Sequence, residues 1–210
     1  MEMNAILYYI HDPLCSWCYA FRTSLAELKQ ALPPEIHFKR LLGGLAPDTT
    51  EPMPPALQQS IQQAWHRIEQ TIPGVKFNFA FWSDNTPIRS TYPACRSLLA
   101  ARKQSAELED KLLSCIQEAY YQRARNPALD ATLFECAIQS GLDKEQFELD
   151  YRSHEIDRQL QQEIKTARSL GVCSYPSLVL GQNSRISSIT VNYLDYRTML
   201  DDIEALLIYR

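Results

Sequence analysis

The chain has 210 residues, of which 45% are hydrophobic and 22% are charged, as in an ordinary globular protein with a buried core. Its formal net charge of -4 provides no basic surface for nucleic acid or an anionic membrane, so neither is expected as a partner. No apolar run approaches the length of about 18 residues that a membrane-spanning helix requires.

The beginning of the chain favours a cytoplasmic location. Residues 1–4 lack the basic region of a signal peptide, and the apolar run at residues 6–10 is too short for its hydrophobic centre. The six cysteines are therefore not expected to form a structural disulfide framework, which small secreted domains need and a chain of this length does not.

The first 44 residues predict a strand, a helix and a second strand. Residues 5–11 are mostly apolar and predict a buried strand, which Pro13 ends. A helix follows, because apolar side chains recur every three or four residues, at Phe21, Leu25, Leu28 and Leu32. Residues 36–42 predict the second strand, which two glycines end.

The middle of the chain predicts helices only. A proline-rich connector comes first, and a helical pattern runs from Leu57 to Ile72. Residues 73–90 have the composition of a loop. Further helical patterns follow at residues 91–104, 106–124, 130–140, 143–151 and 153–170.

The end of the chain returns to strands. Residues 177–180 predict a short apolar strand, residues 181–184 a turn, and residues 186–191 its hairpin partner, before a final amphipathic helix at residues 193–208. Strands at both ends with helices between predict an α/β fold with an inserted all-helical domain. We place the discontinuous sheet domain at residues 1–46 and 171–210 and the insertion at residues 47–170.

The sequence Cys15-Ser16-Trp17-Cys18 lies between the first strand and its helix, where a CxxC motif indicates a redox dithiol. Unpaired amide groups and the dipole at a helix N-terminus favour the thiolate of the first cysteine. Because the thiolate is the nucleophile, we expect Cys15 to attack and Cys18 to resolve the mixed disulfide. Ser16 and Trp17 would tune the redox potential, and Trp17 would also offer an apolar surface to a substrate.

Two structural interpretations of the motif stay open. A CxxC motif is half of a zinc site, but the chain has no second pair, so no metal is expected. The two cysteines could also be buried structural residues. His11 could lie near the thiolate and tune it, although a histidine at a strand end with a solvent or backbone partner explains it equally well.

These residues resemble the DsbA family of the thioredoxin superfamily, specifically its cytosolic FrnE-like branch of predicted protein-disulfide isomerases. The resemblance rests on residues 12–21, which contain the CSWC motif, on the helical insertion, and on residues 171–177. It implies a thioredoxin-like fold, a nucleophilic Cys15, a resolving Cys18 and a cis peptide bond before Pro176. A trans bond at the start of an edge strand is the alternative.

Substrate contacts are expected from Trp17, Ser174 and Tyr175, around the motif and the proline. Two residues depart from the family pattern: Ser16 replaces proline or histidine, and Tyr175 is bulkier than the usual small residue. Cys173, three residues before the proline, could approach the active site, whereas packing explains it more simply.

The sequence therefore predicts a reductase or isomerase of protein or peptide disulfides, with no organic cofactor. Glutathione or a thioredoxin-type partner would recycle it. Two alternatives are a glutathione-dependent transferase or isomerase of a small molecule, like the kappa-class transferases and 2-hydroxychromene-2-carboxylate isomerases, and a partner-binding module without catalysis.

Overall fold

The computed structural model describes residues 5–208, in which one four-stranded sheet is accompanied by nine helices. The elements in chain order are β1 (Ala5–His11), α1 (Ser16–Ala31), β2 (Ile36–Leu42), α2 (Pro55–Thr71), α3 (Phe81–Asp84), α4 (Tyr92–Gln104), α5 (Ala106–Tyr121), α6 (Asp130–Gln139), α7 (Lys144–Tyr151), α8 (His154–Ser169), β3 (Ser177–Gln182), β4 (Arg185–Ile189) and α9 (Tyr196–Ile208). The predicted α/β class is confirmed. No helix within this part of the chain is long and apolar enough to cross a bilayer.

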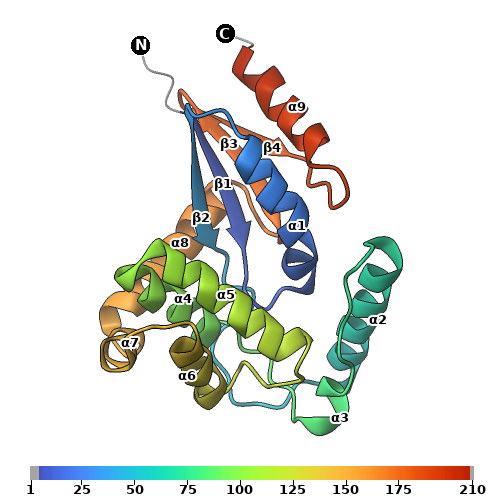
Figure 1. Ribbon diagram of the computed structural model, residues 1–210, viewed down its shortest axis with the longest axis vertical. Coiled ribbons are helices and arrows are strands. Elements are labelled where there is room, and N and C mark those ends of the chain that lie inside the picture. The colour runs from blue at the N-terminus through green and yellow to red at the C-terminus, as the bar shows by residue number, and fades with distance from the viewer. Residues whose placement is uncertain (1–4, 209–210) are drawn as a thin grey trace.

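The sheet has the strand order β2-β1-β3-β4. β1 and β2 are parallel, with Ala5 opposite Ile36, and β3 is antiparallel to both β1 and β4. The parallel pair requires a crossover, which α1 provides. Both parallel strands end toward the helical part of the molecule (Figure 1), so the loop after β1 lies between the sheet and the helices.

Helices cover both faces of the sheet. α1 and α9 pack together on one face, where Phe21 and Met199 are fully buried. α8 lies on the other face, where Ala167 packs with Ile10 and Val179. The N-terminal part of α8 instead belongs to the helical core, through Ile156 and Leu160, so this helix joins the two cores.

The core of the helical part is built around Trp65, which is fully buried. Six aromatic rings lie with their centroids 4.7–6.2 Å from it: Phe77, Phe79, Phe81, Trp82, Tyr120 and Tyr121. These six aromatic side chains therefore belong to the core of the helical part or pack against it.

Three local predictions need correction. The segment predicted as loop between residues 73 and 90 contains the short helix α3. The hairpin turn is only Asn183-Ser184, both with positive φ, because β3 and β4 pair through Gln182 and Arg185. The last helix begins at Tyr196 rather than at residue 193, because the Asn192 side chain holds a turn by accepting from the amides of Leu194 and Asp195.

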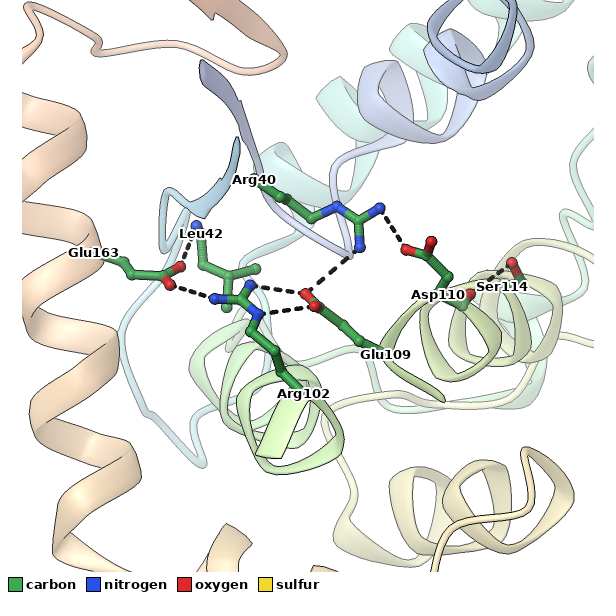
Figure 2. Close-up of polar contacts among 7 residues, drawn as sticks. All are labelled: Arg40, Leu42, Arg102, Glu109, Asp110, Ser114 and Glu163. Atoms are coloured by element: carbon green, nitrogen blue, oxygen red, sulfur yellow. Dashed lines mark hydrogen bonds and ion pairs between the residues drawn. The ribbon is translucent and has the colours of Figure 1, made fainter. Parts of the chain in front are cut away.

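A buried ion-pair network joins the helices to the end of β2 (Figure 2). Arg102 of α4 makes two hydrogen bonds of 2.7–2.8 Å to Glu109 of α5 and one of 2.5 Å to Glu163 of α8. The other oxygen of Glu163 accepts from the backbone amide of Leu42, at 2.7 Å. One guanidinium group therefore connects three helices, and through Glu163 it reaches the end of a strand.

Arg40 of β2 extends the same network. Its guanidinium lies 3.5 Å from the carboxylate of Glu109 and 2.5 Å from that of Asp110. The Glu109 side chain is 6% exposed and that of Asp110 52%, so Glu109 is the buried acid shared by two arginines. Removal of Glu109 would leave both cations without their shared partner.

Candidate active site

Cys15 caps the N-terminus of α1. Its backbone is extended, and its sulfur accepts a hydrogen bond from the Cys18 amide at 3.4 Å. The sulfur thus occupies the place that a serine or aspartate oxygen takes at other helices. An amide donor and the positive end of the helix dipole both favour a negative charge on this atom.

The loop before β3 meets the same sulfur. The Tyr175–Pro176 peptide bond is cis, as the family resemblance implies. The carbonyl oxygen of Tyr175 accepts from the Cys15 thiol at 3.5 Å. Residues 160 positions apart in the chain therefore lie in contact at the end of the sheet.

The ring of Tyr175 lies against Gly43, which follows β2. Its hydroxyl donates to the Gly43 carbonyl at 2.7 Å, and a Cβ on Gly43 would lie 2.1 Å from the ring. No side chain fits at position 43 unless Tyr175 moves.

Gly43→Ala is therefore expected to displace Tyr175 and to lower the free energy of unfolding by about 1–3 kcal/mol. Urea unfolding of Gly43→Ala in the wild type and in a Tyr175→Ala background checks this. The penalty should be small when the ring is absent; an equal penalty in both backgrounds would contradict the steric explanation.

Cys18 lies one turn inside α1 and is only 2% exposed, against 7% for Cys15. Burial raises the pKa of Cys18 well above its ordinary value, and the hydrogen bond and charge of Cys15 raise it further. Tyr9 of β1 lines the same small pocket as Cys18, and burial, followed by the charges of Cys18 and Cys15, raises the pKa of Tyr9. Cys18 therefore holds its proton at neutral pH.

Asp12 anchors the loop that leads to the cysteines. It is fully buried, and it accepts from the amides of Leu14 and Leu45 at 2.9 and 2.7 Å. The Thr91 hydroxyl donates to it at 2.6 Å, and the Cys95 thiol lies at 3.7 Å. Burial raises the pKa of Asp12, while the hydrogen bonds oppose that rise. Asp12 forms the turn, and Cys15 itself caps the helix.

His11 is buried at the end of β1. Its ring stacks on Tyr9 with a centroid distance of 4.9 Å, and its carbonyl accepts from the Gly43 amide at 2.7 Å. Within residues 5–208, the ring atom Nε2 has no hydrogen-bond partner. Burial, followed by the charges of Arg40 and Arg102, lowers the pKa of His11 well below 6.5. Its tuning of the dithiol stays a prediction.

This histidine should make the protein sensitive to acid. The unfolded state binds the proton near pH 6.5 but the folded state does not, so stability falls as the pH drops below that value. We expect His11→Phe, which keeps the ring stack, to remove a dependence of about 1.4 kcal/mol per pH unit. Urea unfolding between pH 7 and pH 5 checks this, with the exposed His37→Asn as control; an unchanged pH slope in His11→Phe would contradict it.

Trp17, inside the motif, is half-buried. Its ring contacts Tyr193, at a centroid distance of 5.4 Å, and Tyr193 contacts Phe21 beneath it. Leu194, the next residue, is 66% exposed. Trp17 and Tyr193 thus place aromatic rings near the two cysteines.

The remaining predicted residues take less constrained positions. Ser16 is half-buried in the first turn of α1, and Ser174 is exposed, with its carbonyl accepting from the Ser177 hydroxyl at 2.8 Å. Cys173 is also exposed. Across residues 5–208, no group of three His, Cys, Asp or Glu side chains is placed to hold a metal ion.

Sequence reasoning missed three residues that the fold brings to this site: Tyr9, Gly43 and Tyr193. Tyr9 lies on the face of β1 that α1 covers, so strand alternation from His11 could have placed it near Cys18. Gly43 and Tyr193 reach the site only through tertiary packing, and their local sequence contains no comparable signal.

The sequence and the fold of this chain are both similar to those of known proteins. A family model described as thioredoxin matches residues 8–200. A structure from Nitrosomonas europaea, provisionally described as a protein disulfide isomerase, is similar, with a TM-score of 0.84 and 25% identity over 97% of this chain and 98% of that chain. The cytosolic disulfide reductase DsbM from Pseudomonas aeruginosa has a TM-score of 0.76 and 23% identity over 96% of this chain and 99% of that chain; it is also known with GSH.

A curated relative has a different description. The ClpXP adapter protein SpxH from Halalkalibacterium halodurans is 23% identical over 177 residues, which is 82% of this chain and 57% of the relative. SpxH from Bacillus subtilis is 25% identical over 173 residues, with 56% of its length covered. The chain thus spans little more than half the length of the curated relatives that it matches.

Proposed function

The chain belongs to the thioredoxin family, and from this premise we propose that it is a thiol-disulfide oxidoreductase that reduces or isomerises disulfides of proteins or peptides. The thioredoxin-like fold and the DsbA-like resemblance predicted from the sequence agree with the family and with the solved structures, and both are confirmed. The activity itself is our proposal.

One observation carries the proposal: the sulfur of Cys15 has the Cys18 amide on one side and the Tyr175 carbonyl, before the cis proline, on the other. The helix N-terminus stabilises a thiolate there, and a thiolate is the species that attacks a disulfide. An extended peptide lying along the loop before β3 would present its disulfide to this sulfur, with Trp17 as an apolar contact.

The reaction then has two exchange steps. The Cys15 thiolate attacks one substrate sulfur, which forms a mixed disulfide and releases the other sulfur as a thiolate. Cys18 attacks the Cys15 sulfur, which closes the protein disulfide and releases the second substrate thiol, while the Cys18 proton passes to the departing sulfur. Two molecules of a thiol such as glutathione, or one thioredoxin-type dithiol, would reduce the protein again.

We favour reduction or isomerisation over net oxidation, because the dithiol form dominates in a reducing compartment. The description of DsbM as a cytosolic disulfide reductase, and its structure with GSH, support this direction and glutathione as the co-substrate.

Partner binding without catalysis is a second candidate, because the two SpxH relatives are described as adapters. In that role the chain would bind its partner whether or not the cysteines are present. A glutathione-dependent transferase would differ again, since its activity would survive Cys18→Ala.

Activity assays on wild type, Cys15→Ala and Cys18→Ala separate these functions. Reduction of insulin disulfides by glutathione should need both cysteines, whereas rearrangement of a scrambled disulfide protein needs only Cys15. Loss of either activity in Cys15→Ala supports the proposal. Absence of disulfide turnover in the wild type would overturn it, and partner binding unaffected by both substitutions would then favour the adapter.

A further inference from the structure

A second pair of cysteines meets in the helical part of the molecule. Cys115 lies on α5 and Cys136 on α6, two helices that pack against each other. The Cys115 thiol donates to the side chain of Gln139, one turn beyond Cys136, at 3.4 Å. Cys115 is therefore next to the part of α6 that carries Cys136, and the two thiols interact electrostatically. We propose that Cys115 and Cys136 form a second redox-active pair, which closes a reversible disulfide between α5 and α6.

The two thiols differ in access, as the members of the CSWC motif do. Cys115 is half-buried and lines an open surface hollow of about 690 Å³ with Gln139 and Arg123. Cys136 lies behind it and is 3% exposed. A disulfide in solution therefore reaches Cys115 first, and Cys136 is placed to resolve the product.

The surroundings favour this division of roles. The Arg123 guanidinium lines the same hollow as Cys115 and interacts with both sulfurs. Burial and the contact with Cys115 raise the pKa of Cys136 above its ordinary value, so Cys136 keeps a proton that it can share with the outer sulfur. Lys111 and Arg123 are paired with Glu107 and Glu118, so the hollow has no strong net charge.

The oxidant is a low-molecular-weight disulfide, and the exchange balances. The Cys115 thiolate attacks one sulfur of the disulfide, forms a mixed disulfide and releases one thiolate. Cys136 then attacks the Cys115 sulfur and releases the second thiolate, which takes up the Cys136 proton. The protein pair loses two electrons, and the small disulfide becomes two thiols.

The helix that carries Cys115 also contacts the loop and the helix of the CSWC motif, so oxidation of the pair would affect that site. Gln117, two residues after Cys115, donates to the carbonyl of Pro13 in the active-site loop at 3.4 Å. The ring of Tyr121, at the end of the same helix, packs in a tilted arrangement against that of Tyr19, at a centroid distance of 4.5 Å. A covalent link from α5 to α6 therefore restrains the helix that supports the active-site loop.

Tryptic mapping of the reduced and the oxidised full chain tests the pair directly. The protein is incubated with neutral 2-hydroxyethyl disulfide, its remaining thiols are blocked with N-ethylmaleimide, and it is digested and examined by mass spectrometry. Trypsin separates the two cysteines into peptides 112–123 and 126–144, each with no other cysteine. We expect these peptides to be linked in most molecules and to separate after treatment with dithiothreitol.

Single substitutions supply the controls. In Cys136→Ser, Cys115 should remain as a mixed disulfide with the 2-hydroxyethyl probe. In Cys115→Ser, Cys136 should form no disulfide with the probe. The linkage should persist in Cys15→Ser/Cys18→Ser, which makes the result independent of the proposed activity. Recovery of both peptides as maleimide adducts, or a lasting mixed disulfide on Cys115 in the wild type, would overturn the proposal.

Discussion

Cys15→Ser is expected to lower the rate of disulfide reduction by at least about a thousandfold, because a hydroxyl is not ionised at neutral pH and cannot replace the thiolate. The fold should remain intact, since serine is among the preferred residues at the N-terminus of a helix and its oxygen can accept from the Cys18 amide. Insulin reduction measures the rate, and urea unfolding measures the stability of the same variant.

Cys18→Ser provides the matched comparison. Cys15 can still attack, but the mixed disulfide has no resolving thiol, so the protein should accumulate bound to its substrate. Mass spectrometry of Cys18→Ser after incubation with a disulfide peptide should find one peptide on Cys15. Retention of full activity by Cys15→Ser would contradict the assigned roles, as would a failure of Cys18→Ser to trap the peptide.

Glu109→Ala is expected to lower the free energy of unfolding by about 3–5 kcal/mol, the largest effect on stability that we anticipate. The substitution leaves the guanidinium groups of Arg102 and Arg40 in a largely buried site without the acid that they share. The loss comes from taking a buried acid away from two cations at once: among the described residues, Arg102 keeps only Glu163, and Arg40 keeps only the exposed Asp110. Removing one partner of a buried ion pair is strongly destabilising. Urea unfolding monitored by tryptophan fluorescence measures it.

Two further variants show whether burial is the cause. Asp110→Ala removes the exposed partner of Arg40 and should cost less than about 1 kcal/mol. Glu109→Gln keeps a hydrogen-bond acceptor without the charge. Its loss of unfolding free energy should lie between those of Glu109→Ala and Asp110→Ala. Equal losses in Glu109→Ala and Asp110→Ala would refute the idea of a buried network.

The spacing of apolar residues along the sequence was enough to predict the first strands and the helix between them. β1, α1 and β2 follow from apolar runs and a helical repeat bounded by prolines and glycines. Because the CSWC motif lies at the junction of strand and helix, the position of Cys15 as the helix cap could be anticipated. The cis bond before Pro176 came from the family resemblance, which supplied long-range information that periodicity lacks.

Contacts between distant segments could not be anticipated. Gly43 looks like an ordinary strand terminator, and its need to be glycine arises from the Tyr175 ring, which comes from the other half of the sheet domain. The bond from the Leu14 amide to Asp12 is local, whereas the bonds of Asp12 to Leu45 and Thr91 depend on how the helical part docks. The network around Glu109 likewise depends on helix packing.

Domain boundaries are harder to read because one helix serves both cores. α8 packs on the helical core near Ile156 and on the sheet near Ala167. A sequence pattern of period 3.6 identifies such a helix but not the partners of its two ends. The proposed insertion at residues 47–170 therefore stays a prediction about the chain, while the packing itself is continuous.

Equilibration of the wild-type protein with glutathione buffers of varied redox ratio tests the proposed activity most directly. After rapid acid quenching, tryptic peptide 1–22, which contains both Cys15 and Cys18, is examined for an internal disulfide. The account predicts one reversible two-electron transition, in which the ratio of protein disulfide to dithiol is proportional to the concentration of oxidised glutathione divided by the square of that of reduced glutathione. Failure of Cys15 and Cys18 to form that disulfide at any ratio would contradict it.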